Sequence, residues 1–421
     1  MKIIINGAGI GGLVLALMLH KRGLAPILYE SSTEIKPLGV GINVQPSAIV
    51  ELTELGLLEK LRATGIETAE VVYFNKFGQR IWAEPRGVAA GYLVPQFSIH
   101  RGELQMLLLS TVIERLGADA VKTGYEGMSV DPDKGALTVK HKATGIETVV
   151  HGDVVVSADG IHSALRRQFY PNEGPPKFSG CILWRATTVG MPFLSGRSMA
   201  MAGHADMKLV CYPISQRYAT QGKAMINWIA ELKIPDDEPP KDDWNREVDR
   251  NIFAPQFADW NFDWLDVPKM FEGAERVFEF PMVDRDPLPK WSHGKVTLLG
   301  DAAHPMYPIG SNGATQSVLD ARALADQIEG STVADIESAL VRYEQERLPK
   351  TAKIVMVNRA QGPDAAMQVV EDRAPNGFTN VDDVVSIAEL QQIALNYKKV
   401  VGLDLETVNA KAAKLDLAKA A

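Results

Sequence analysis

The stretch Lys2-Ile3-Ile4-Ile5-Asn6-Gly7-Ala8-Gly9-Ile10-Gly11-Gly12 decides the fold. Its apolar first half is typical of a buried parallel strand, and Gly7, Gly9 and Gly12 form the pattern G-x-G-x-x-G. These glycines allow a tight turn, let a pyrophosphate approach the backbone, and let the strand pack closely on a helix. We therefore expect a helix from about Leu13 to Lys21, whose amino end presents free N–H groups to phosphate.

A second apolar run, residues 25–30, ends in an acid 18 residues beyond Gly12. The carboxylate of Glu30 is placed to accept hydrogen bonds from adenosine ribose hydroxyls, and it would repel a 2′-phosphate. This pattern predicts a dinucleotide site and disfavours NADP there, but it does not separate NAD from FAD. The alternative is a βαβ unit that binds no nucleotide.

Two further apolar runs end in acids. Residues 153–158 precede Asp159-Gly160, and residues 296–299 precede Gly300-Asp301. Asp-Gly alone is also a common turn pair. All three motifs nevertheless follow predicted parallel strands, and ligands of open α/β sheets bind at the carboxyl ends of such strands. An acid at the third strand end, with a helix predicted over 313–328, suits a flavin and its reduced, negatively charged ring.

Composition excludes several classes of protein. The 421 residues suffice for two or three domains, and 46% hydrophobic with 23% charged residues is typical of globular proteins. A formal net charge of -8 argues against nucleic-acid binding. Two cysteines make no disulfide framework, which favours a reducing compartment such as the cytoplasm. Glycines interrupt the apolar N-terminus, so we expect neither a signal peptide nor, anywhere else, a membrane span.

With these motifs in this order and spacing, residues 1–360 resemble the flavoprotein aromatic hydroxylases of the para-hydroxybenzoate hydroxylase type. Within that family, residues 37–46, 98–106 and 281–289 are most similar to the phenazine monooxygenases. The resemblance implies an α/β fold: a Rossmann-like FAD-binding domain with a parallel sheet, an inserted and mostly antiparallel β-sheet substrate domain, and C-terminal helices. It also implies FAD, not NAD, in the glycine-rich site.

The implied domains are discontinuous. The FAD-binding domain takes residues 1–70, 98–177 and 281–360, the substrate domain takes residues 71–97 and 178–280, and residues 361–421 form a C-terminal helical segment. That last segment carries no recognisable chemistry.

The resemblance also assigns roles to individual residues. Cofactor contacts are expected from the glycine-rich turn and its acid, from a loop near the flavin, and from the other two strand ends: Gly7, Gly9, Ile10, Gly12, Glu30, Val40, Gly41, Arg101, Asp159, Gly160, Gly300, Asp301, Gly310, Asn312, Gly313 and Ala314. Pro305 and Tyr307 are expected near the reactive edge of the flavin, and no metal site is expected. His304 has no evident partner and is interpreted as structural. Trp184, Arg185 and Tyr212 are candidates for the substrate pocket, ordinary sheet core being their alternative.

The implied function is an FAD-dependent monooxygenase. NADH or NADPH would reduce the flavin, dioxygen would give a C4a-hydroperoxide, and one oxygen atom would pass to a small aromatic or heteroaromatic substrate, with or without loss of a carboxylate. The resemblance further suggests a homodimer. The alternatives are a flavin oxidase or reductase that inserts no oxygen, and a non-catalytic flavin-binding protein whose contacts residues 362–421 could serve.

Overall fold

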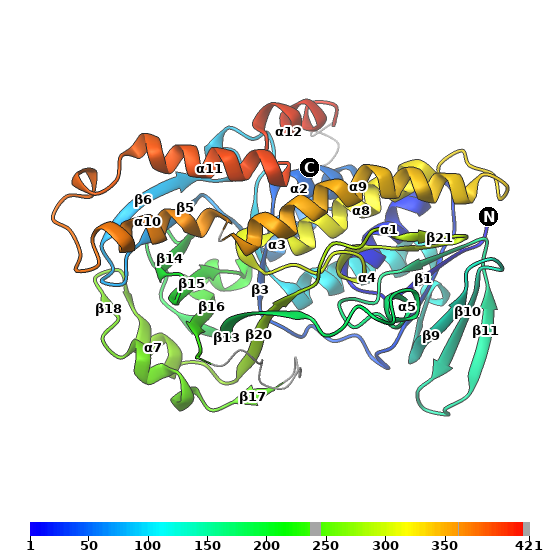
Figure 1. The fold of residues 1–421 in the computed structure, drawn as a ribbon, viewed down its shortest axis with the longest axis horizontal. Helices are drawn as coiled ribbons and strands as arrows, with labels where there is room; N and C mark the ends of the chain where they lie inside the picture. The colour runs from blue at the N-terminus through cyan, green and yellow to red at the C-terminus, as the bar shows by residue number, and fades with distance from the viewer. Residues whose placement is uncertain (236–245, 361, 416–421) are drawn as a thin grey trace.

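The computed structural model describes residues 1–235, 246–360 and 362–415. A mostly parallel sheet and a larger, mostly antiparallel sheet lie towards opposite ends of the long axis (Figure 1). The chain enters the larger sheet twice, so each sheet is built from separate segments of the sequence.

The first sheet contains the predicted phosphate-binding strand. In spatial order its strands are β21 (Ser292–His293), β22 (Val296–Leu298), β12 (Val154–Ser157), β1 (Ile3–Asn6), β2 (Ile27–Glu30) and β8 (Val121–Thr123). Neighbours from β22 to β8 pair in parallel. Ile3 and Ile5 pack with the helices, whereas Ile4 packs with a small sheet on the opposite face. The strand is therefore buried on both faces, which explains its unbroken apolar run.

The helices on the first sheet follow from the sequence pattern. They are α1 (Ile10–Lys21), α4 (Arg101–Leu116), α8 (Gly313–Ile328) and α9 (Ile336–Arg359), and α5 (Ala164–Phe169) packs with the small sheet of β9 (Tyr125–Asp131), β10 (Ala136–His141) and β11 (Glu147–His151). Residues 10–19 of α1 are all buried, and the helix ends just before Gly23, whose φ of +78° favours glycine. The strands and helices predicted around the three motifs are thus confirmed.

The second sheet is wide and mostly antiparallel. Its strands in spatial order are β17 (Glu247–Val248), β20 (Val277–Asp284), β13 (Lys177–Gly190), β16 (Ala224–Lys233), β15 (Met207–Pro213), β14 (Ser198–His204), β5 (Glu70–Phe74) and β6 (Arg80–Pro85). Among these described strands, β14 and β5 pair in parallel and the other neighbours are antiparallel.

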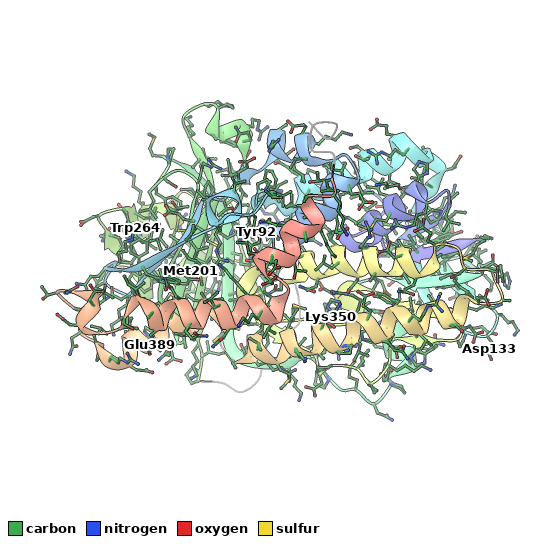
Figure 2. All side chains as sticks on the ribbon, turned by 90° about the horizontal axis from the view of Figure 1, so that it is seen from above. Tyr92, Asp133, Met201, Trp264, Lys350 and Glu389 are labelled. Carbon is green, nitrogen blue, oxygen red and sulfur yellow. The ribbon has the colours of Figure 1, made fainter. Side chains whose placement is uncertain are left out.

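Different elements cover the two faces of this sheet. On one face Trp228 packs with Phe253 and Phe271, the latter from α7 (Val267–Glu272). On the other, Met201 packs in one cluster with Leu390 of α11 (Ile387–Val401) and with residues of α10 (Ala365–Arg373), as Figure 2 shows from above. Helices α10 and α11 are therefore part of this half of the molecule.

The remaining elements connect these layers: α2 (Pro46–Glu54), α3 (Leu58–Thr64), α6 (Gln216–Ala219), α12 (Leu405–Ala412), a small sheet of β3 (Gly41–Val44), β7 (Phe97–His100) and β4 (Ile66–Glu67), and the pair β18 (Asn261–Phe262) and β19 (Leu265–Asp266). Helix α9, at 24 residues about 36 Å long, runs from the first sheet to the second. Near its start Tyr343 donates a hydrogen bond to the carbonyl of Leu298, and at its end Arg359 pairs with Asp284 of β20.

This architecture confirms the predicted fold class, an α/β parallel sheet with a mostly antiparallel sheet and C-terminal helices. In the parts of the chain that the structure describes, every helix is too short or too polar to cross a membrane.

Candidate functional site

A cavity of about 760 Å³ opens where β1, β12 and β22 end. It lies at the carboxyl edge of the parallel sheet, where open α/β sheets bind ligands. Most of the predicted cofactor residues come together there, because Gly9, Ile10, Val40, Arg101, Gly160, Gly300, Asp301, Gly313 and Ala314 line it. Pro305, predicted near the flavin edge, lines it too. Three segments far apart in the sequence thus build one cleft.

The glycine-rich turn fits a phosphate group. A Cβ on Gly7 would lie 2.4 Å from the carbonyl oxygen of Ala158, and one on Gly12 would lie 2.2 Å from that of Gly7. A Cβ on Gly9 would meet nothing within 4 Å, although Gly9 lines the cavity. Gly9 also precedes α1, whose amino end has no side-chain cap among the described residues. Free N–H groups beside open space are what an incoming pyrophosphate needs.

The acids at the first two strand ends support the backbone of the cleft. Glu30 accepts hydrogen bonds from the backbone N–H of Ala8 at 2.9 Å and of Ser32 at 2.7 Å. Asp159 accepts one from the Ser157 hydroxyl, and burial raises the pKa of its carboxyl group. Neither side chain lines the cavity, although Gly160, which follows Asp159, does.

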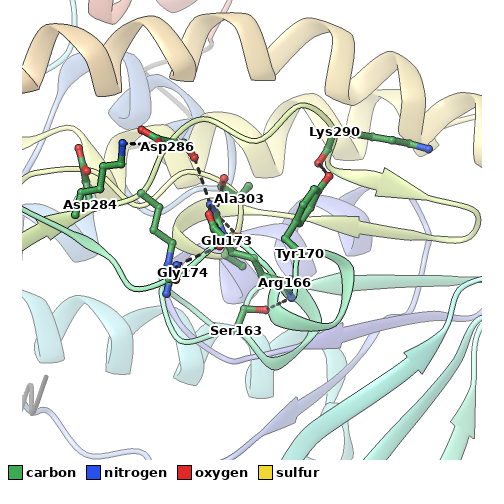
Figure 3. Close-up of polar contacts among 12 residues, drawn as sticks. Ser163, Arg166, Tyr170, Glu173, Gly174, Asp284, Asp286, Lys290 and Ala303 are labelled. Atoms are coloured by element: carbon green, nitrogen blue, oxygen red, sulfur yellow. Dashed lines mark hydrogen bonds and ion pairs between the residues drawn. The ribbon is translucent and has the colours of Figure 1, made fainter.

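Arg166 joins the second strand end to the third (Figure 3). Its side chain is 1% exposed and donates to the carbonyls of Ala302 and Ala303 at 3.0 and 2.9 Å. Glu173 neutralises the guanidinium and also pairs with Arg285. The loop that carries Asp301 is therefore fixed by a buried arginine of α5, to which the sequence patterns assigned no role.

His304 has a structural position behind the same loop. It is buried, and its Nε2 lies 2.5 Å from Asp320 of α8. Asp320 also accepts hydrogen bonds from the backbone N–H of Gly300 and from Arg347 of α9. Although burial alone would raise the pKa of Asp320, His304 and Arg347 outweigh it and lower that pKa to about 2. Asp301, by contrast, faces the cavity, and its enclosure raises the pKa of its carboxyl group.

A second cavity of about 240 Å³ adjoins the first. Ile42, Leu183, Arg185, Asp301, Met306, Pro308, Gly313 and Ala314 line both cavities, so the two share a wall. The rest of the second cavity follows one face of the large sheet, with mostly apolar side chains: Val71, Tyr73, Met199, Met201, Val210, Tyr212 and Ile229. A planar apolar molecule in this space would lie beside whatever occupies the larger cleft.

Arg185 and Tyr212, two of the candidates for the substrate pocket, line the second cavity. Both donate hydrogen bonds to the carbonyl of Gly41, at 3.1 and 3.0 Å, and the Gly41 N–H donates to Asn227 at 2.6 Å. The loop of Val40 and Gly41 is thereby tied to the large sheet. Burial lowers the pKa of Arg185 and raises that of Tyr212 to about 12. Among the described residues, no carboxylate forms an ion pair with Arg185.

Two other candidates lie elsewhere. Trp184 lines neither cavity; its ring stacks on Phe253 and donates to Glu279 on the far face of the sheet. Successive residues of a strand face opposite sides, so Trp184 cannot share a pocket with Arg185. Tyr307 also lies outside both cavities, packed with Cys181 and Met282 against a smaller hollow.

The C-terminal segment contributes residues that the sequence did not suggest. Pro363, Asp364, Tyr397 and Leu403 line the second cavity. The Tyr397 hydroxyl accepts a hydrogen bond from Asn312 at 2.5 Å and donates one to Asn358 at 3.0 Å. Tyr397 lies so close to Gly310 that a Cβ there would be 1.8 Å from its hydroxyl oxygen. Leu403 is held by Tyr92, which donates to its carbonyl at 2.6 Å near the start of α12 (Figure 2). No local pattern signals such distant contacts.

Comparison with known proteins identifies the family to which this chain belongs. Residues 1–358 match the family described as FAD binding domain. The chain belongs to the FAD-binding-domain family. Within it, the chain is 44% identical over 405 residues to the phenazine 1,6-dicarboxylic acid hydroxylase PhzS of Lysobacter antibioticus, covering 95% of this chain and 97% of that protein. It is 31% identical to the 3-amino-4-hydroxybenzoate 2-monooxygenase PtmB3 of Streptomyces platensis, covering 91% and 94%.

Solved structures agree on the fold. HpxO of Klebsiella pneumoniae, in complex with FAD and uric acid, matches with a TM-score of 0.70 at 20% identity, covering 98% of this chain and 96% of that one. The FAD-binding-domain membership and these relatives confirm the sequence-based prediction of an FAD-dependent aromatic monooxygenase, with FAD as cofactor and NAD(P)H as the family's reductant.

Proposed function

We propose that this protein inserts one atom of dioxygen into a planar, carboxylated nitrogen heterocycle of the phenazine class. The observation that carries the proposal is the shared wall: a dinucleotide-type cleft borders an apolar cavity through Asp301, Pro308 and Arg185. The substrate class is supported by the relative at 44% identity, whose name specifies a phenazine dicarboxylic acid.

The reaction balances in either of two forms. In simple hydroxylation, Ar–H, O₂, NAD(P)H and H⁺ give Ar–OH, NAD(P)⁺ and water. In the decarboxylative form, Ar–COO⁻, O₂, NAD(P)H and two H⁺ give Ar–OH, CO₂, NAD(P)⁺ and water. FAD, when bound, supplies the redox chemistry of both forms. The protein positions the ring and excludes water.

We assign the cofactor to the larger cleft. Its pyrophosphate would bind at Gly7, Gly9, Ile10 and Gly12, and Glu30 would hold the adenosine ribose. The strand ends at Asp159-Gly160 and Gly300-Asp301, with Arg101, would hold the rest of the chain. Val40, Gly41, Pro305 and the segment Gly310–Ala314 would border the ring. For the FAD-binding and substrate domains we propose the boundaries that the family resemblance implies.

Arg185 is the residue we assign to anion recognition. It is a guanidinium on the shared wall, without a carboxylate partner among the described residues, and its Nε makes no hydrogen bond there. A buried cation of this kind is stabilised by a ligand anion. Its position suits a substrate carboxylate or the negative charge of the reduced flavin. Tyr212 would orient it through their common acceptor, Gly41.

The test is turnover by the purified holoprotein. We expect a flavin absorbance spectrum, and oxidation of NADH or NADPH that accelerates when phenazine-1-carboxylate or phenazine-1,6-dicarboxylate is added. With isotopically labelled dioxygen, one labelled atom should enter the product. Turnover without label would identify an oxidase or reductase. Nicotinamide oxidation that no aromatic compound accelerates would favour a non-catalytic flavin protein.

A homodimer and a cytoplasmic location are proposals that rest on the resemblance and on the composition. Sedimentation at micromolar concentration would test the first, since a monomer there contradicts it. Fractionation of cells would test the second.

A further inference from the structure

The end of the second cavity opposite Arg185 also carries an arginine. Arg86 follows β6, and it lines the cavity together with Tyr73 of β5 and Gln96. Arg185 lies on β13, and β16, β15, β14 and β5 lie between β13 and β6. At about 4.8 Å per strand, five spacings separate the two arginines by about 24 Å along the sheet before their side chains reach inward. The two cations therefore mark opposite ends of one elongated space.

Charge is not balanced around Arg86. Its Nη2 lies 2.8 Å from one oxygen of Glu84, and Nζ of Lys398, from α11, lies 2.5 Å from the other. These side chains are 14%, 6% and 22% exposed, respectively. Two cations thus share one carboxylate, which leaves one positive charge in a buried place. Burial lowers the pKa of Arg86, but Glu84 and Tyr73 outweigh it, so the pKa is raised and the guanidinium stays charged.

Arg86 also has an unused donor. Its Nε makes no hydrogen bond with the described residues, and neither does the buried Oε1 of Gln96. Desolvated donors and charges without partners are costly, and native proteins rarely keep them without a ligand or water. The guanidinium therefore has both the charge and the geometry to receive an anion.

The third cation on the cavity wall behaves differently. Lys208 lies 3.1 Å from Glu231 and 2.5 Å from Asp364. One cation there faces two carboxylates, so that cluster has no positive charge to spare. The contrast singles out Arg86, and not Lys208, as the anion-binding group at this end.

We propose that Arg86 is a second anion subsite, which holds a carboxylate at the far end of a substrate whose other end lies at Arg185. The inference rests on the proposed function and narrows its substrate to an aromatic dicarboxylate. The apolar side chains between the two arginines, among them Val71, Met201 and Val210, would cover the ring system. Lys398 is a positioning residue, because it neutralises Glu84 and so leaves the positive charge of Arg86 free to bind a substrate carboxylate.

Equilibrium binding tests the subsite. The oxidised holoenzyme is titrated with phenazine-1,6-dicarboxylate, phenazine-1-carboxylate and phenazine, and the flavin absorbance change gives each Kd. The wild type should prefer the dicarboxylate to the monocarboxylate by at least about tenfold. Arg86→Gln should bring that ratio close to one and leave the Kd of phenazine unchanged.

Two further variants test the direction in which the dicarboxylate preference should change. Glu84→Gln removes the carboxylate that competes for Arg86 and should raise the dicarboxylate preference. The matched control is Lys76→Gln, which breaks a partly buried ion pair with Glu371 outside the cavity and should leave the ratio unchanged. Flavin content and melting temperature are recorded for each variant, so that a folding defect is visible.

The outcomes separate the two proposals. If the wild type binds phenazine carboxylates but Arg86→Gln leaves the ratio unchanged, or weakens all three ligands equally, the subsite is wrong and the proposed function stands. If the wild type binds none of the three ligands, the phenazine substrate class and the subsite both fall.

Discussion

The two adjoining cavities are built in opposite ways. The larger cleft is built around six glycines, the ends of three parallel strands and the amino end of α1, with residues of β20 along part of its wall. The smaller cavity is lined by side chains from five strands of the large sheet and from the C-terminal segment. A site built from glycines and strand ends suits a cofactor that all members of a family share. Side chains in a cavity can be substituted without altering the fold, so they suit substrates that differ between members. The difference predicts that substitutions in the cleft affect folding and FAD binding, and that substitutions in the smaller cavity affect substrate binding.

The largest effect should come from Asp320→Asn, behind the cleft. The variant would leave Arg347 buried without its carboxylate, at a cost of about 3–5 kcal/mol in the free energy of unfolding. Because the folded-state pKa of Asp320 is about 2 and its ordinary value is 3.8, its contribution is complete above about pH 4 and is lost as the pH falls towards 2. Urea unfolding should show that the difference in the free energy of unfolding between wild type and variant is large at pH 7 and becomes smaller below pH 4. The control Asp326→Asn removes an acid that is 41% exposed and should cost less than about 1 kcal/mol.

A pair of glycine variants should separate folding from cofactor binding. Gly7→Ala puts a Cβ 2.4 Å from a backbone oxygen at a φ of +113°, and we expect a loss of about 3 kcal/mol in stability. Gly9→Ala meets open space, so the apoprotein should keep its stability within about 0.5 kcal/mol. The same methyl group would project where the phosphate is proposed, and the Kd of FAD should rise at least about tenfold. Tight FAD binding by Gly9→Ala would contradict the assignment of the cleft.

Asp301→Ala should weaken FAD without unfolding the protein. Its carboxylate faces the cleft, and a charged hydrogen bond to the ligand contributes about 1.5–3 kcal/mol. We expect the FAD dissociation constant, measured by fluorescence after reconstitution, to rise by about 10- to 150-fold. Asp133→Ala, which changes an exposed acid between β9 and β10 that does not line the cleft (Figure 2), serves as the control. Retention of wild-type affinity would remove Asp301 from the cofactor site.

The smallest effect should belong to Tyr397→Phe, in the side-chain-built cavity. The variant keeps the ring and loses the hydroxyl that contacts Asn312 and Asn358. Since a neutral hydrogen bond contributes about 0.5–1.5 kcal/mol, the KM for the aromatic substrate should rise by about two- to tenfold while the Kd of FAD stays constant. Tyr125→Phe, on β9, should change neither constant. A higher Kd of FAD in Tyr397→Phe would show that the two cavities are not independent.

The sequence predicted the cleft because its signals are local. Each motif directly follows the strand that positions it, so Gly9, Gly160 and Asp301 could be placed together without coordinates. The smaller cavity has no comparable signal. Tyr397 reaches Gly310 from a helix at the far end of the chain, and Lys398 reaches Glu84 in the same way.

One misplacement was avoidable. Trp184 and Arg185 are neighbours on β13, and the twofold alternation of a strand already excludes both from the same pocket. The position of Tyr307 could not be predicted in this way. It lies in an irregular loop, where no periodic pattern indicates which way a side chain points.

The wall that Tyr397 and Leu403 supply has a consequence for biosynthesis. Ribosomes make proteins from the amino end, so the glycine-rich turn emerges early, and α11 emerges after every residue that lines the larger cleft. We therefore expect a chain that stops before α11 to contain every residue of the larger cleft while its second cavity is open to water. On the proposed assignment, the substrate site is completed only after α11 has been synthesised.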